Sequence, residues 1–213
     1  MGRLADLDAV TLDANGTLVE LVDPVPKLGR ILRDRGVERS AGAIRRAFET
    51  EGIVYAGRAA EAHEPSAFAR IQRECTSVFL AEVGAAALDP EEFAPAYVGA
   101  MEFEVLPGVA KTLRFLRRCG LALAVVANFD LTLGDRLGAL GLAPSFSAVV
   151  TPAGAAAAKP DVRIFEHALE RVGVSPERAL HIGDGKVDED GARSAGMHFE
   201  WAPVPEAIAR WSG

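Results

Sequence analysis

The sequence predicts an α/β protein, a parallel sheet flanked by helices with an all-helical segment inserted after the first strand. Short apolar runs recur along the chain and have the length of buried strands. Amphipathic stretches that end at a glycine lie between these runs and are typical of helices. One long segment near the N-terminus carries only helical patterns. The alternation indicates a parallel sheet, and the segment without strands indicates an insertion.

The three clearest strand candidates are apolar on both faces, which predicts strands covered by helices on both sides. They are "DAVTL" at 8–12, "LALAVVA" at 121–127 and "RALHIG" at 178–183. "SAVVT" at 147–151 and "HFEW" at 198–201 are weaker candidates. The first three runs end at a polar residue followed by a turn, namely Asp13, Asn128 and Asp184.

Helical patterns separate the later strands. "GVAKTLRFLRRCG" at 108–120 has its apolar residues at helical spacing and stops at Gly120. "LGDRLGALGL" at 133–142 and "DVRIFEHALERVGV" at 161–174 behave in the same way. Strand and helix in alternation predict a Rossmann-like core.

The region from 20 to 104 contains no convincing strand pattern. Four amphipathic stretches fill it, at 24–37, 41–57, 65–86 and 89–101, with prolines at their edges. We therefore predict two domains, an α/β core formed by 1–19 and 105–213 and a helical insertion formed by 20–104.

Composition narrows the class of partner. The 213 residues carry a net charge of -7 and the pI is near 5.2, which argues against non-specific nucleic-acid binding. The longest apolar run, 121–127, is far shorter than the roughly 20 residues that span a bilayer. Cys75 and Cys119 form no metal-type pair, and the N-terminus has no apolar signal region. We expect a cytoplasmic protein without nucleic-acid or membrane partners; the oligomeric state stays open.

Polar residues at the strand ends predict a site. In an open parallel sheet, ligands bind beyond the carboxyl ends of the strands, where Asp13, Asn128 and Asp184 are expected. Lys159, in a loop before a helix, adds a cation to the same edge. Two carboxylates, an amide and an ammonium suit a divalent cation and a phosphoryl group.

Four segments carry a family resemblance. "LDANGTL", "VVANFD", "KPDVRIF" and "HIGDGKVDEDGARSAGM" follow one another in this order. They resemble the four motifs of the haloacid dehalogenase (HAD) superfamily, in the branch with a helical cap after the first strand. The similarity covers nearly the whole chain. Most members of that superfamily are phosphatases, so the resemblance implies a small phosphorylated molecule as substrate.

The resemblance also implies roles for single residues. Asp13 would be the nucleophile that becomes an aspartyl phosphate, and Lys159 would offset charge between Asp13 and the transferring group. Mg²⁺ would be held by Asp13, the backbone carbonyl of Asn15 and Asp184, with Asp188 as the supporting acid.

Further residues are candidates for binding the substrate. The backbone after Asp13, at Gly16 and Thr17, would help to hold the phosphoryl oxygens, and Asn128 stands in the phosphate-binding position. Phe129 would line the entrance. Arg58 is a candidate cap contact, as are Tyr55 and His63, since an arginine suits a carboxylate or a second phosphate.

The chain also departs from the family pattern. Asn15 stands where phosphatases of the family usually have an aspartate that acts as general acid and base. Ala127 replaces a hydroxyl residue, only Gly and Ala precede Lys159, and Gly185 follows Asp184 where Ser or Asp is commoner.

Three readings stay open. The leading one is a Mg²⁺-dependent phosphatase, slowed by the loss of general acid–base catalysis at Asn15. The second is a repurposed or catalytically silent member that binds a ligand or partner, or performs another reaction. The third is dehalogenase chemistry, which needs no Mg²⁺ and whose relatives carry an aromatic residue at the position of Asn15.

Overall fold

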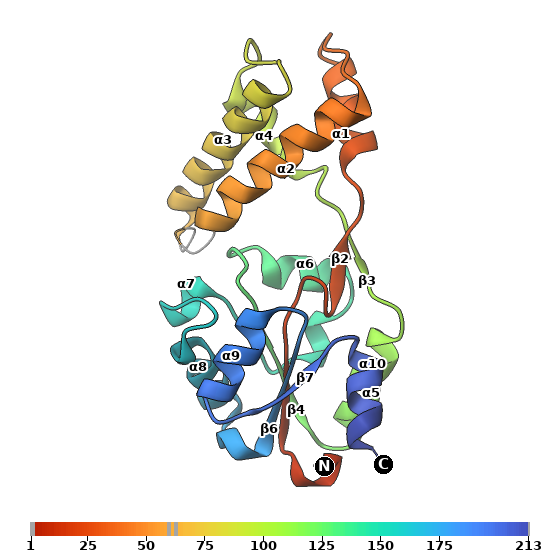
Figure 1. Ribbon diagram of the computed structural model, residues 1–213, viewed down its shortest axis with the longest axis vertical. Coiled ribbons are helices and arrows are strands. Elements are labelled where there is room, and N and C mark those ends of the chain that lie inside the picture. The colour runs from red at the N-terminus through yellow and green to blue at the C-terminus, as the bar shows by residue number, and fades with distance from the viewer. Residues whose placement is uncertain (1–2, 59–60, 62–63, 213) are drawn as a thin grey trace. The chain divides into compact units, whose positions relative to one another are not determined.

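The chain divides into two compact units. A computed structural model describes residues 3–58, 61 and 64–212 of the 213 (Figure 1). One unit comprises Met1–Glu20 and Glu104–Gly213, and the other comprises Leu21–Phe103.

The first unit contains a five-stranded parallel sheet in the order β5-β4-β1-β6-β7. Its strands are β1 (Ala9–Leu12), β4 (Ala122–Val126), β5 (Ala148–Val150), β6 (Ala179–Gly183) and β7 (His198–Trp201). All five coincide with the predicted runs, so the α/β fold class with a Rossmann-like parallel sheet is confirmed.

The central strand β1 sets the register of the sheet. Leu12 is paired with Val125 of β4 on one side and with Ile182 of β6 on the other. Every residue of β1 and β6 is buried. Burial on both faces explains why these segments read as uninterrupted apolar runs rather than as an alternation. The alignment also brings the ends of the three strands to one edge of the sheet.

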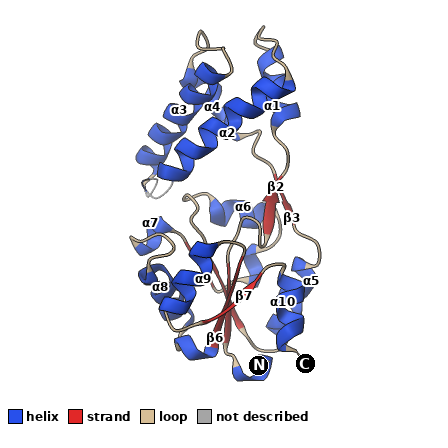
Figure 2. Ribbon diagram, viewed as in Figure 1, coloured by secondary structure: helices blue, strands red, loops and turns tan. Residues whose placement is uncertain are grey.

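Helices cover both faces of the sheet. The elements are α5 (Val109–Arg118), α6 (Leu133–Ala139), α7 (Pro152–Ala155), α8 (Val162–Val172), α9 (Lys186–Ser194) and α10 (Val204–Trp211), with 3-10 turns at Leu4–Asp6, Ala143–Ser145 and Pro176–Arg178. Helices α8 and α9 lie on one face, and α5 and α10 on the other (Figure 2). Ile164 and Phe165 of α8 are fully buried in the hydrophobic core of this unit.

The second unit is built from α1 (Val25–Arg33), α2 (Ala41–Arg58), α3 (Pro65–Glu82) and α4 (Pro90–Val98). Its core centres on Phe79, whose ring centroid lies 4.8 Å from that of Tyr97 and 6.2 Å from that of Phe93. Among the residues described, no helix combines the length and apolar character needed to cross a bilayer.

The expectation of no strand from 20 to 104 differs from the structure at both ends of that segment. Strands β2 (Val19–Leu21) and β3 (Phe103–Val105) pair in a separate two-stranded sheet where the chain leaves and re-enters the first unit. Three residues are too few to show a period of two. Their strand character comes from pairing with each other across the length of the insertion, which a local pattern does not reveal.

Candidate active site

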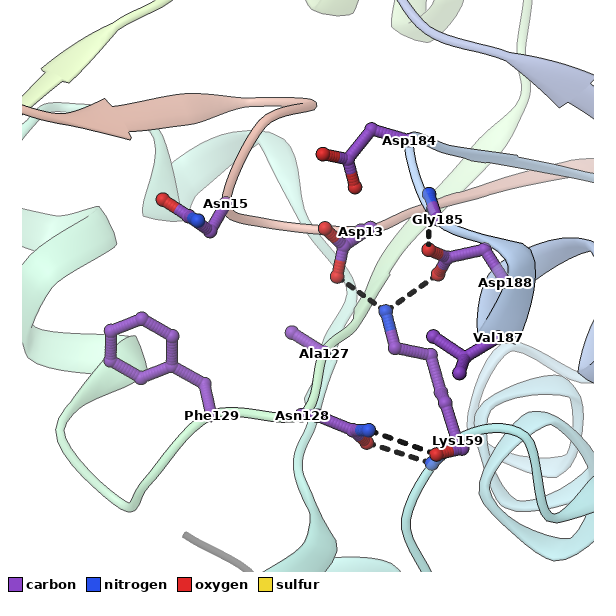
Figure 3. Close-up of a pocket in the computed structure, with 10 residues that line it drawn as sticks. All are labelled: Asp13, Asn15, Ala127, Asn128, Phe129, Lys159, Asp184, Gly185, Val187 and Asp188. Carbon is purple, nitrogen blue, oxygen red and sulfur yellow. Dashed lines mark hydrogen bonds and ion pairs between the residues drawn. The ribbon is translucent and has the colours of Figure 1, made fainter. Parts of the chain in front are cut away.

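A pocket of about 200 Å³ lies at the carboxyl edge of the parallel sheet. It is lined by residues that follow β1, β4 and β6, together with the loop before α8 (Figure 3). The lining residues are Asp13, Asn15, Ala127, Asn128, Phe129, Lys159, Asp184, Gly185, Val187 and Asp188. The polar residues predicted to converge from separate strand ends therefore share one pocket.

A buried lysine bridges two carboxylates at the base of this pocket. The Nζ atom of Lys159 donates a hydrogen bond to Asp13 Oδ1, and another to Asp188 Oδ1 at 2.6 Å. All three side chains are buried. Burying an unpaired charge is expensive, so this mutual pairing is what allows three ionisable groups to lie beneath the surface.

Three carboxylates can meet a single ion. Oxygen atoms of Asp13, Asp184 and Asp188 lie within 4.8 Å of one another. These three carboxylates outnumber the single ammonium of Lys159 in the pocket lining, so two negative charges are uncompensated when all are ionised. Carboxylate oxygens are the ligands that Mg²⁺ prefers, and the excess charge equals that of one divalent cation. The residues present fit the predicted Mg²⁺.

The environment shifts the pKa values of these carboxyl groups in different directions. Burial raises the pKa of Asp13 to about 6, against the opposing charge of Lys159. Burial, with the nearby charge of Asp188, also raises the pKa of Asp184. Burial would also raise the pKa of Asp188. The hydrogen bond from His181 and the charge of Lys159 outweigh this effect, so the pKa of Asp188 is lowered. Asp188 is thus the most firmly ionised of the three.

Two glycines give the carboxylates room. Gly16 has φ +81°, and a Cβ atom there would lie 2.0 Å from Asp184 Oδ2. A Cβ atom on Gly183 would lie 2.4 Å from Asp188 Cγ. The backbone must therefore lack side chains at both positions for these acids to reach the pocket.

Asn15, Asn128 and Phe129 line the pocket as predicted, and Asn15 is exposed in it. The side-chain amide of Asn128 is hydrogen-bonded to the backbone of Lys159. The guanidinium of Arg136 lies 5.8 Å from the centroid of the Phe129 ring. Their roles toward phosphate or substrate remain predictions.

The remaining candidates are not among the residues that line the pocket. Gly16 and Thr17 do not line the pocket; the Gly16 N–H donates to the Val19 carbonyl at 2.8 Å. Thr17 is buried, and its hydroxyl has no hydrogen-bond partner among the described residues. Arg58, in the second unit, forms ion pairs with Glu61 at 3.0 Å and with Glu74. His63 falls outside the described residues.

Two residues at the site were not anticipated from the sequence. His181 is fully buried in β6, and its Nε2 atom lies 3.0 Å from Asp188 Oδ1. The signal that could have found it is a lone ionisable residue inside an otherwise apolar strand. Val187 is 41% exposed and lines the pocket beside Asp188. No sequence signal separates it from an ordinary helix residue.

The parallel sheet carries a pocket of three carboxylates and one lysine at its carboxyl edge, and the family model that this chain matches describes a hydrolase. The chain belongs to the haloacid dehalogenase-like hydrolase family, whose family model matches residues 7–196. This confirms the family resemblance of the four sequence motifs.

Individual relatives agree with this assignment. Phosphoglycolate phosphatase of Caulobacter vibrioides is 34% identical over 209 residues, covering 92% of this chain and 80% of that protein. Haloacid dehalogenase-like hydrolase domain-containing protein 3 of Bos taurus is 45% identical over 107 residues. That alignment covers 50% of this chain and 43% of the relative, so the chain matches less than half of the relative's length.

A solved structure matches the fold over almost its full length. A HAD-hydrolase of Bacillus subtilis, crystallised with magnesium, has a TM-score of 0.74 and covers 97% of this chain and 99% of its own. The sequence identity is 18%, so this likeness concerns the fold alone.

Proposed function

We propose that this protein hydrolyses a small phosphate ester with the help of Mg²⁺, through an aspartyl phosphate on Asp13. The observation that carries the proposal is the buried Lys159 bridging Asp13 and Asp188, with Asp184 close enough to share an ion with both. Relatives named phosphoglycolate phosphatase and phosphoserine phosphatase support a phosphate ester as the substrate class.

In the first step, a carboxylate oxygen of Asp13 bonds to phosphorus while the bond from phosphorus to the ester oxygen breaks. The leaving oxygen takes that electron pair. Lys159 keeps the attacking carboxylate oriented, and its charge offsets the charge that builds up around phosphorus. Asp13, the Asn15 carbonyl and Asp184 would hold Mg²⁺, which would supply further positive charge to the phosphoryl oxygens. In the second step, a water oxygen bonds to phosphorus while the bond from phosphorus to the Asp13 oxygen breaks, which releases inorganic phosphate and regenerates the Asp13 carboxylate.

The proton balance makes this reaction demanding. An alkoxide leaving group needs a proton, and the attacking water must lose one. Asn15 lines the pocket, but at neutral pH an amide neither donates a proton to an alkoxide nor removes one from water. The proposal therefore includes slow turnover of alkyl phosphates and faster turnover of esters whose leaving group is a weak base.

A repurposed or silent member of the family is the second candidate. Two pocket-lining residues favour it, because Asn15 lacks a titrating carboxyl group and Ala127 lacks a hydroxyl. Such a protein would bind a phosphorylated molecule without turning it over.

The deciding experiment measures release of inorganic phosphate from p-nitrophenyl phosphate and a panel of alkyl phosphates, with Mg²⁺ and after its removal by EDTA. We expect Mg²⁺-dependent release, faster from the aryl ester, and no release by Asp13→Asn. A purified protein that releases no phosphate from any ester, yet gains thermal stability from one panel member, would establish the second candidate instead.

A further inference from the structure

A chain of buried side-chain contacts runs from the middle of the sheet to the pocket. Thr11 Oγ1 of β1 lies 2.8 Å from His181 Nδ1 of β6, and His181 Nε2 lies 3.0 Å from Asp188 Oδ1. The same Asp188 oxygen accepts a hydrogen bond from Lys159, which also donates to Asp13. The four links join two strands, a helix and a loop.

The His181 ring is fixed by hydrogen bonds at both nitrogens and by contacts with two aromatic rings. Thr11 and His181 are direct partners in the β1–β6 register, so the hydrogen bond between them is fixed by the sheet itself. The Phe165 ring meets His181 edge-on at 88°, with a centroid distance of 5.0 Å, and the Phe199 centroid lies 6.2 Å away. The side chain is completely buried, and both ring nitrogens have partners, as buried polar groups require.

Asp188 is oriented by three donors. Its Oδ1 atom accepts hydrogen bonds from Lys159 Nζ and from His181 Nε2. Its Oδ2 atom accepts a hydrogen bond from the Gly185 N–H at 3.2 Å. A carboxylate oxygen can only accept, so Nε2 must carry the hydrogen. His181 is the donor that ties Oδ1 to the rigid sheet. Without it, the carboxylate could turn, and the ammonium bound to it would move.

We propose that His181 is a positioning residue of the active site. It holds Asp188, and through Asp188 it holds Lys159 in place against Asp13. His181 is not among the residues that line the pocket. The consequence for turnover rests on the proposed phosphatase function, whereas the positioning itself does not.

Two substitutions of equal length test the proposal. His181→Gln keeps an N–H donor at about the reach of Nε2, and His181→Met fills similar space without a donor. Loss of a group that orients a metal ligand typically costs about 10–100-fold, and Asp188 is a candidate ligand, so the Met variant should lose about that factor in kcat with KM unchanged. The Gln variant should retain most of the wild-type kcat. Equal losses in both variants would overturn the proposal, since packing alone would then explain them.

A spectroscopic readout decides the question without turnover. In ¹⁵N-labelled protein, the His181 ring should show a slowly exchanging hydrogen on Nε2, and the Lys159 Nζ resonance should shift in the Met variant but not in the Gln variant. A ring hydrogen on Nδ1 alone, or an unmoved Lys159 resonance in the Met variant, would refute the positioning role. If the wild-type protein releases no phosphate from any ester, the proposed function fails, and these resonances still test the inference.

The Met variant could fail to fold, and Thr11→Val then takes its place. This change removes only the hydroxyl that anchors Nδ1, at the far end of the chain of contacts. We expect faster exchange of the Nε2 hydrogen and a shifted Lys159 resonance. Spectra identical to those of the wild type would contradict the proposal.

Discussion

The side-chain amide of Asn128 is paired at both ends with the backbone of Lys159. Its Nδ2 atom donates to the Lys159 carbonyl at 2.9 Å, and its Oδ1 atom accepts from the Lys159 N–H at 2.7 Å. This double contact ties the segment after β4 to the loop before α8, although 31 positions separate the two residues. Lys159 is thus fixed at its backbone by Asn128 and at its ammonium by Asp13 and Asp188.

Replacing Asn128 by Leu should loosen Lys159. The change keeps the size of the side chain and removes both hydrogen bonds, so we expect the free energy of unfolding to fall by about 1–2 kcal/mol. Phosphate release should fall as well, because the ammonium is less well placed. Chemical denaturation and the phosphate assay would measure both effects, and a Leu variant identical to wild type would refute this role.

Restoring an acid at position 15 should accelerate the reaction. Asn15→Asp places a titrating carboxyl group in the pocket, and a positioned general acid contributes roughly 10²–10⁴-fold. The gain should appear mainly with alkyl phosphates, because an aryl leaving group needs no proton. Asp13→Asn should abolish turnover in both backgrounds. Unchanged rates across a broad panel would mean that Asn15 does not limit the reaction, and the non-phosphatase reading would move ahead.

Gly16→Ala should weaken Mg²⁺ binding through a specific clash. The added Cβ would lie 2.0 Å from Asp184 Oδ2, so the carboxylate must leave its position. Gly120→Ala is a matched control, because Gly120 has φ +85° and an added Cβ would meet nothing within 4 Å. Each variant should lose about 1–2 kcal/mol of stability from backbone strain. Titration calorimetry should find weaker Mg²⁺ binding in the Gly16 variant alone; equal affinities would exclude the clash.

The raised pKa of Asp13 predicts a pH-dependent stability in the metal-free protein. The folded-state pKa is about 6 and the ordinary pKa of an aspartate is 3.8, so between these pH values the folded state holds a proton that the unfolded state releases. Stability from this group is present at low pH and is lost as the pH rises through that window. Asp13→Asn has no such titration, so the difference in unfolding free energy between this variant and the wild type should shift in favour of the variant between pH 4 and pH 7.5 by on the order of 1–3 kcal/mol. Denaturation curves at both pH values would test this, and a constant difference would contradict it.

With Mg²⁺ bound, the wild type should gain stability as the pH rises, opposite to the trend expected for the metal-free protein. The ion needs an ionised Asp13, and protons compete with it below the raised pKa of this group. Mg²⁺ should therefore raise the melting temperature of the wild type more at pH 7.5 than at pH 5, and should raise that of Asp13→Asn little at either. A Mg²⁺ effect independent of pH would count against Asp13 as a ligand.

Much of the fold and part of the site follow from the sequence. β1 and β6 are buried on both faces, so their uninterrupted apolar runs identify them, and the polar residue after each marks the edge at which ligands bind. Asp13, Asn128, Lys159 and Asp184 could be assigned to one site because parallel strands end at one edge. Local periodicity and residue order carry this information.

Other features were decided only by the tertiary structure. The pairing of β2 with β3 joins segments on either side of the whole insertion, and neither segment has a strand pattern of its own. The pairing of Asn128 with the Lys159 backbone depends on how two loops pack. The contact of His181 with Asp188 requires the register of β6 beside β1 and the first turn of α9 above it. A sequence determines which side chains are buried through short-range periodicity, whereas distances between distant side chains arise from the packing of the assembled sheet and helices.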